Sequence, residues 1–216
     1  FIVSLLFISY GLYLGLFVAP SDYQQGDAFR IIYVHVPSAW LSLFAYTSVF
    51  ICSVISLIWK IKVFEILSIS SAKNGAIFTF LALITGSIWG KPMWGTWWVW
   101  DARLTSELIL LFIYLSIIFL YHSYDDYRKG AKAANILAII GFINIPIIHF
   151  SVEWWNTLHQ GPSVMKFSSP SIASEMLYPL IYTTIGFTSY LLLAILMSAR
   201  NTLMDHEKNT NWIKSI

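Results

Sequence analysis

Long apolar runs, separated by short polar segments, constrain this chain more than any other feature. A helix needs about 20 apolar residues to cross the hydrocarbon core of a bilayer. Of the 216 residues, 57% are hydrophobic and 11% are charged, which is too apolar a composition for a water-soluble domain. The apolar runs cover residues 1–19, 38–59, 75–89, 102–121, 133–150 and 172–199.

The runs predict an all-α integral membrane protein with six transmembrane helices. The third run is short, so we expect its helix to extend back through Ser71 and Ala72, with Lys73 reaching the inner headgroups. Residues 1–200 then form a single domain, followed by a short polar inner tail at residues 201–216.

The basic residues predict how the chain is oriented, because lysine and arginine favour the cytoplasmic or matrix side. The segments after the second, fourth and sixth runs carry nine of them, and the opposite segments carry four. Both termini are therefore expected on the cytoplasmic or matrix side. The four outer cations are Arg30, Lys91, Arg103 and Lys166.

Charge and cysteine content exclude several classes of protein. A formal net charge of +2 with scattered basic residues does not favour nucleic acid binding. Cys52 is the single cysteine, so the chain holds neither a disulfide framework nor the cysteine pair of a covalent haem attachment site. No nucleotide-binding motif occurs, so any ATP hydrolysis would belong to partner subunits.

The predicted second outer loop contains an unusual density of tryptophan. With Trp89, the segment 94–101 places five indoles within 13 residues, whereas an aromatic belt at the headgroups needs no such cluster. Flat indole faces suit a large planar ligand such as a porphyrin. Asp101 precedes the fourth run, and a helix cap is its favoured role over direct ligand contact.

Two histidines lie beside outer aromatic residues. Pro37 suits the first turn of the second helix, which would leave His35 just outside that helix. Helical spacing would align Trp155 with His159. Two imidazoles can take the axial positions of haem iron, although each histidine alone is more often an interfacial hydrogen-bonding residue.

Other ionisable residues lie near the outer ends of the predicted helices. Arg103 and Glu107 are four residues apart, which fits an ion pair on one helix or a polar rim for a haem edge. Arg103 is the favoured cation for a haem propionate. His149 is expected to form a hydrogen bond within the bundle rather than to act as a third ligand.

Three motifs together resemble a known family of haem-handling proteins. They are Val34-His35-Val36-Pro37, the run from Pro92 to Thr105, and Ser151-Val152-Glu153-Trp154-Trp155-Asn156-Thr157-Leu158-His159-Gln160. In this order they resemble the CcmC family of the system I cytochrome c maturation machinery, and residues 94–101 resemble its WWD domain.

This resemblance implies a haem-binding and haem-transfer protein rather than an enzyme. Haem b would bind non-covalently, with His35 and His159 as the axial ligands. Its platform would be residues 94–101, and Trp154, Trp155 and Arg103 are further expected haem-binding residues. Within that segment, Trp94, Trp97, Trp98, Trp100 and Asp101 are the site residues.

The resemblance also implies a location and partners. The protein would bind haem at the periplasmic face of the bacterial inner membrane, or in the mitochondrial inner membrane. It would deliver haem to the chaperone CcmE and associate with the single-span subunit CcmD and the ABC transporter subunits CcmA and CcmB.

Three other functions fit the sequence less well. A cytochrome b electron-transfer subunit usually holds its paired histidines within helices, deep in the bundle. A haem-free permease predicts broken helices and a polar site near the midplane. A purely structural subunit would need no tryptophan cluster.

Overall fold

The protein is a bundle of long apolar helices. The computed structural model describes residues 1–159, 161, 164, 171–208 and 210, and within them the regular elements are all helical. Five segments are long and apolar enough to cross a membrane: Asp27–Trp59, Lys62–Trp94, Ala102–His122, Tyr127–Trp154 and Ser174–Glu207. This confirms a helical, multi-pass membrane architecture.

The remaining predicted span is shorter. Helix α1 (Ile2–Tyr13) continues into a π-helical turn, η1 (Leu14–Val18). Together they extend about 26 Å at 1.5 Å per residue, slightly less than the thickness of a hydrocarbon core. The six-span count and the side on which each terminus lies therefore stay predictions.

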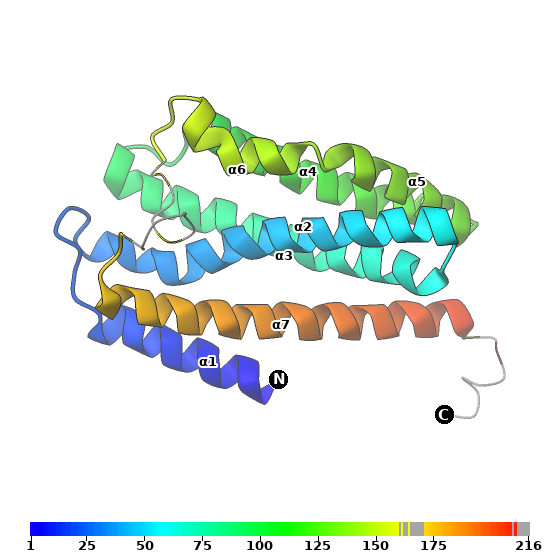
Figure 1. Cartoon of the computed structure of the whole chain (residues 1–216), viewed down its shortest axis with the longest axis horizontal. Coiled ribbons are helices and arrows are strands. Elements are labelled where there is room, and N and C mark those ends of the chain that lie inside the picture. Colours follow the sequence, from blue (N-terminus) through cyan, green and yellow to red (C-terminus); the bar gives the residue numbers. More distant parts are fainter. Residues whose placement is uncertain (160, 162–163, 165–170, 209, 211–216) are drawn as a thin grey trace.

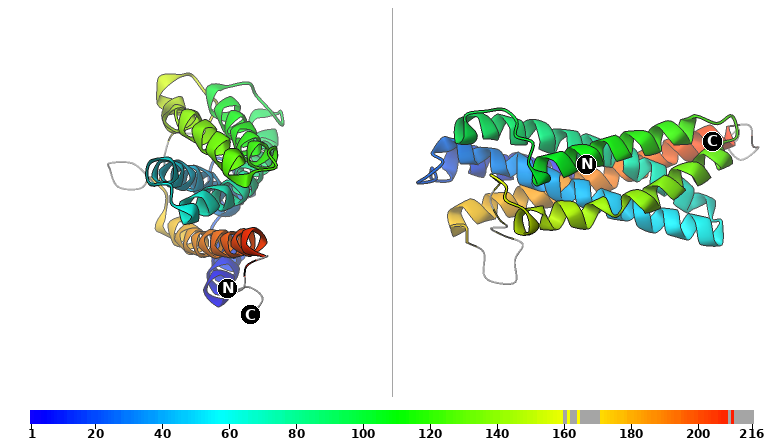
Figure 2. Two further views of the ribbon diagram at one scale, coloured as in Figure 1. Left: turned by 90° about the vertical axis from the view of Figure 1, so that its right-hand side faces the viewer. Right: turned by 90° about the horizontal axis from the view of Figure 1, so that it is seen from above.

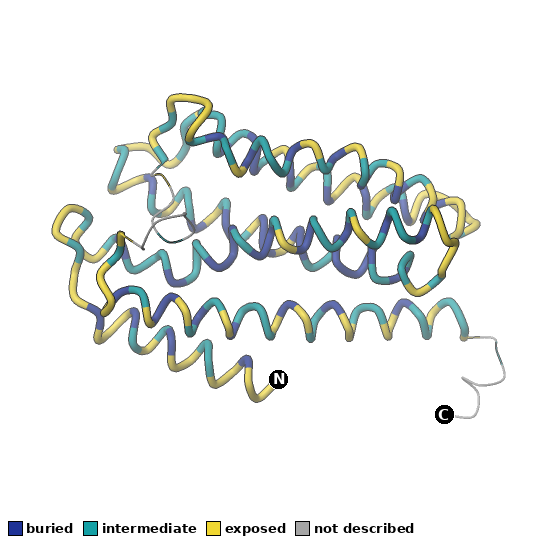
Figure 3. The backbone as a smooth tube through the Cα atoms, in the orientation of Figure 1, coloured by how far each residue is buried: buried dark blue, intermediate teal, exposed yellow. Residues whose placement is uncertain are grey.

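The helices pack in pairs that form three layers (Figures 1 and 2). Helices α2 (Ile32–Trp59) and α3 (Lys62–Trp94) form the middle layer. Helix α1 pairs with α7 (Ser174–Glu207) on one side. On the other side α4 (Ala102–His122) packs against α5 (Tyr127–Gly141) and α6 (Asn144–Trp154). Buried residues concentrate in the middle layer (Figure 3).

Several helices exceed the apolar runs that predict them. Helix α3 begins at Lys62, well before the predicted start, because its first half contains small polar residues that lower the hydropathy. Ser68, Ser70 and Ser71 are buried against neighbouring helices. Helix α7 likewise continues to Glu207, whose carboxylate pairs with Lys62 at the start of α3.

A buried polar cluster joins three of the helices. The Asn135 side-chain oxygen accepts hydrogen bonds from Ser53 Oγ and Ser68 Oγ, both at 3.0 Å. Asn135 Nδ2 donates to Ser56 Oγ at 3.1 Å. Since the hydrocarbon core offers no water to satisfy these groups, the cluster fixes α5 against α2 and α3.

Close backbone approach in the middle layer depends on small residues. A Cβ at Gly75 would collide with the ring and hydroxyl of Tyr114, so only glycine admits this tyrosine between α3 and α4. The Tyr114 hydroxyl then donates to the Ser42 carbonyl oxygen at 2.7 Å. Tyr46 bonds the Ala138 carbonyl oxygen in the same way, at 3.1 Å.

The predicted outer segments gather at one end of the bundle (Figure 1). Helix α2 is preceded there by a 3-10 turn, η2 (Asp27–Ile31). Arg30 of this turn pairs with Asp27 at 3.0 Å and donates to the Gly15 carbonyl oxygen at 2.7 Å. These contacts hold the connection between η1 and α2 in place at the end that carries His35.

The buried cluster generates a stability prediction. Asn135→Ala should lower the free energy of unfolding by about 1–2 kcal/mol, because it removes the buried hydrogen bonds that join Asn135 to three serines of α2 and α3. Thermal unfolding in detergent, followed by helical circular dichroism, measures the loss. Asn74→Ala is the matched control, since the hydrogen bond that its side chain makes among the described residues is to the Ser70 carbonyl oxygen of its own helix. Equal losses in both variants would contradict a role for the cluster.

Candidate haem site

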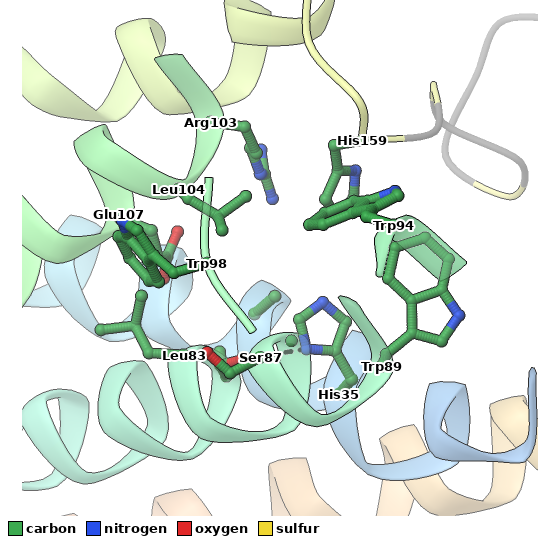
Figure 4. Close-up of a pocket in the computed structure, with 13 residues that line it drawn as sticks. His35, Leu83, Ser87, Trp89, Trp94, Trp98, Arg103, Leu104, Glu107 and His159 are labelled. Carbon is green, nitrogen blue, oxygen red and sulfur yellow. Dashed lines mark hydrogen bonds between the residues drawn. The ribbon is translucent and has the colours of Figure 1, made fainter. Parts of the chain in front are cut away.

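A pocket opens among the helix ends at the predicted outer end of the bundle (Figure 4). Helices α2, α3 and α4 form its walls, and the segments that follow α3 and α6 contribute the rest. Its lining combines two imidazoles, three indoles, a guanidinium and a carboxyl with small and apolar residues. The polar and aromatic members are His35, His159, Trp89, Trp94, Trp98, Arg103 and Glu107.

His35 lies inside a helix, which corrects the expectation that it precedes one. The 3-10 turn η2 leads directly into α2 at Ile32, so His35 falls in the first turns of the helix. Pro37 is also within α2, where it has no amide to donate to the Tyr33 carbonyl oxygen. The Ser38 hydroxyl bonds the next carbonyl oxygen, that of Val34, at 2.6 Å.

Helix α3 fixes the orientation of the His35 ring. Its Nδ1 lies 3.0 Å from both the Ala82 carbonyl oxygen and Thr85 Oγ1. An Nδ1 proton donated to the carbonyl oxygen leaves Nε2 as the lone-pair nitrogen, and this nitrogen faces the pocket (Figure 4). Gly86 permits the arrangement, since a Cβ there would lie 3.1 Å from His35 Cε1.

His159 approaches the same pocket from the segment after α6 (Figure 4). Helix α6 ends at Trp154 and Trp155 is extended, so the predicted helical alignment of Trp155 with His159 is wrong. The two imidazoles nevertheless meet, with ring centroids 6.3 Å apart and planes inclined by 38°. The folded chain therefore brings together two nitrogen ligands that are distant in sequence.

The tryptophan cluster divides into lining and exposed members. Trp94 and Trp98 line the pocket, whereas Trp97 and Trp100 are 55% and 77% exposed. Trp89, at the end of α3, also lines the pocket and packs edge-on against Trp94 at 5.1 Å. Its Nε1 donates to Gln25 Oε1 at 2.9 Å, which ties the preceding outer loop to the site.

Arg103 and Glu107 contact the pocket separately. Arg103 Nη1 donates to the Ile148 carbonyl oxygen at 2.8 Å, and the guanidinium points into the pocket (Figure 4). Glu107 is buried, and its Oε1 accepts from Ser42 Oγ at 2.8 Å. The predicted ion pair is not among the salt bridges of the described residues. Arg103 therefore keeps donors available to an anion in the pocket.

The remaining predicted residues surround the pocket without lining it. Asp101 caps α4, as expected, by accepting a hydrogen bond from the Leu104 amide at 2.8 Å. Trp154 and Trp155 are exposed, and Trp154 stacks on Phe150 at 5.2 Å. His149 is also exposed, with its ring against Phe150, so it lies outside the pocket lining and is not buried within the bundle as expected.

This arrangement suits a planar metal complex better than a free ion. The pocket supplies two imidazole nitrogens, and the described residues contain no group of three or more histidine, cysteine, aspartate or glutamate side chains placed to hold a metal. Haem brings four nitrogens of its own and needs only axial ligands from the protein. The indoles add apolar faces for the ring.

Some lining residues were not identified from the sequence. Ala39, Ala82, Leu83, Gly86 and Ser87 carry no chemical signal of their own and reach the pocket only because α2 packs on α3. Trp89 belonged to the counted cluster but was not assigned to the site. Its spacing of five residues from Trp94 was the signal that could have placed both on neighbouring turns.

Fold and site define a multi-pass helical membrane protein with paired imidazoles in a tryptophan-lined pocket. The family model of heme exporter protein C (CcmC) matches residues 1–214. The chain is 51% identical to heme exporter protein C of Haemophilus influenzae over 99% of its own length and 87% of that protein. For heme exporter protein C of Escherichia coli the identity is 48%, over 100% and 86%.

Similarity extends to a plant mitochondrial protein. A putative cytochrome c biosynthesis ccmC-like protein of Marchantia polymorpha is 52% identical over 82% of this chain and 74% of that protein. The chain belongs to the heme exporter protein C family.

The cap at Asp101 generates a prediction that separates its structural role from ligand contact. Asp101→Ala should lower the free energy of unfolding by about 1 kcal/mol, while Asp101→Asn, which keeps an acceptor, should cost a few tenths. Thermal unfolding of the purified protein measures both. A similar loss in the two variants would show that the carboxylate charge, and not the cap, matters at this position.

Proposed function

We propose that this protein binds haem between His35 and His159 at the outer face of the membrane and passes it to a haem chaperone. The observation that carries the proposal is the pairing of the two imidazoles across one pocket. Metal–nitrogen bonds of about 2.0 Å place the ring centroids of two axial imidazoles about 6.4 Å apart. The observed 6.3 Å agrees with this value.

The surroundings of the two rings support the same ligand. The contact of His35 Nδ1 with Ala82 and Thr85 holds the ring in the tautomer that presents Nε2 to iron. Trp94 and Trp98 supply apolar faces for the porphyrin. Arg103 is the cation in the pocket lining and would pair with a propionate.

Transfer rather than storage follows from the composition of the site. Two neutral imidazoles can be replaced one at a time by a competing histidine from an acceptor, so the haem is held without being trapped. The exposed Trp97 and Trp100, beside the pocket, would meet that acceptor. No bond-forming chemistry is assigned to the chain.

The partners and the location extend this proposal. The acceptor is the chaperone CcmE, and CcmD, CcmA and CcmB are the associated subunits, in keeping with the name heme exporter of the relatives. The haem is haem b, bound non-covalently. The site faces the periplasm in a bacterial inner membrane, or the corresponding side of the mitochondrial inner membrane.

A cytochrome b subunit is the second candidate. It gains support from His35, which lies within α2 and not in a loop. The pocket, however, lies at one end of the bundle, and His159 follows a helix instead of belonging to one. Electron transfer between buried haems is therefore less well supported than exchange at a surface.

Replacement of the ligands tests the proposed site. With ample haem during expression, the purified protein should show a low-spin bis-histidine absorption spectrum, and His35→Ala or His159→Ala should each abolish it, because one axial bond is lost. His149→Ala is the matched control, since this histidine is exposed outside the pocket. Unchanged spectra in both ligand variants, or wild-type protein without haem, would rule out the assignment.

Replacement of the tryptophans separates binding from transfer. Trp94→Ala and Trp98→Ala should each weaken haem affinity about tenfold or more, because each removes an aromatic contact of about 1–3 kcal/mol. Trp97→Ala and Trp100→Ala should leave the affinity unchanged and slow transfer to purified CcmE. Haem titration and transfer kinetics, both followed at the Soret band, distinguish the two pairs. Equal loss of affinity in all four variants would contradict this division.

A further inference from the structure

A second hollow adjoins the pocket on the lipid-facing side of the bundle. It runs between α3 and α4, and we refer to it as the lateral groove. All of the residues that line it are uncharged, and all but Ser87 are apolar or aromatic. From α3 they include Phe80, Ile84 and Ile88, and from α4 Leu108 and Leu111.

The lateral groove and the haem pocket share part of their walls. Leu83, Ser87 and Trp98 line both of them, so these three side chains form the partition between lipid and pocket. Figure 4 shows Leu83, Ser87 and Trp98 on one side of the pocket. The two hollows are thus neighbours that share three lining side chains.

Trp98 is the largest side chain of this partition and is not held by a hydrogen bond. Its Nε1 is buried and has no partner among the described residues, in contrast to Trp89, whose Nε1 bonds Gln25. Turning the Trp98 indole therefore breaks no hydrogen bond. It would also free a buried donor from a site where it is unsatisfied.

On this basis we propose that haem passes between the bilayer and its pocket through the lateral groove, by displacement of Trp98. The inference rests on the proposed haem site. Haem is an apolar plate with two anionic groups on one edge, and the groove offers no charged residue to receive them. On release the apolar edge leaves first, while the propionates stay beside Arg103 in the pocket, and on entry the same path is followed in reverse.

The top of the pocket offers a poorer route. On that side Trp89, which donates a hydrogen bond to Gln25, and His159 line the pocket. Passage in that direction would break a hydrogen bond and move a ligand. Passage through the lateral groove would displace the Trp98 indole from its edge-on contact with Trp100 but would break no side-chain hydrogen bond of Trp98 among the described residues.

Obstruction of the lateral groove tests the route. Ile84→Trp adds bulk at a lipid-exposed position that lines the groove and not the pocket. In nanodiscs, association of hemin and its release to excess apomyoglobin should both slow about tenfold, while the dissociation constant stays the same. Ile77→Trp is the matched control, because Ile77 is 62% exposed on the same helix outside the groove.

The outcomes separate the route from the site. Wild-type rates in Ile84→Trp, or faster release with unchanged association, would overturn the route while leaving the bis-histidine spectrum intact. If Ile84→Trp instead loses a partner subunit on purification, while its rates of hemin association and release are unchanged, the groove is a protein contact and the route is wrong. Leu111→Trp, from the opposite wall, repeats the measurement if Ile84→Trp does not fold. If the wild-type protein shows no low-spin spectrum, the proposed function itself is wrong.

Discussion

Helix α2 packs side by side with α3 through the middle of the bundle, and the placement of the site depends on this contact. It brings the Ala82 carbonyl oxygen and Thr85 to His35, and it sets Gly86 where a larger residue would push the imidazole aside. In a membrane, helices associate through close packing and hydrogen bonds rather than through burial from water. Small and polar residues are therefore the ones that hold this layer together.

The two ends of the bundle differ in their polar contacts. Toward the predicted inner end, hydrogen bonds of Asn135 with its serine partners and the ion pair of Lys62 with Glu207 join helices. At the outer end, polar atoms of Glu107 and Trp98 are buried without partners among the described residues. Buried polar atoms without partners also occur at Ser70 and His206 in the described part of the chain, so what distinguishes Glu107 and Trp98 is that both line the pocket.

The proposed function rests on features that each give little indication of function but lie together in the folded chain. A histidine at a helix start and another after a helix end carry little meaning separately, and an exposed tryptophan cluster resembles a membrane belt. Their convergence on one pocket, with a 6.3 Å separation of the imidazoles, is specific. The pocket also shares lining side chains with an apolar groove, which supports the proposal that the bilayer is a source or sink of haem.

The sequence alone determined the membrane class, the approximate positions of most helices and, through its motifs, the family. These follow from local composition, because each helix in lipid must satisfy its own backbone. It did not determine the start of α2, which follows a 3-10 turn, or the length of α3, whose first half contains buried serines. Nor did it determine the end of α6, which stops before the extended Trp155. Only tertiary structure separated Trp94 and Trp98 from Trp97 and Trp100, and only it placed Thr85 behind His35. The reason is that helix packing determines which side chains of a segment face the pocket. A run of neighbouring tryptophans in the sequence does not show which of them do so.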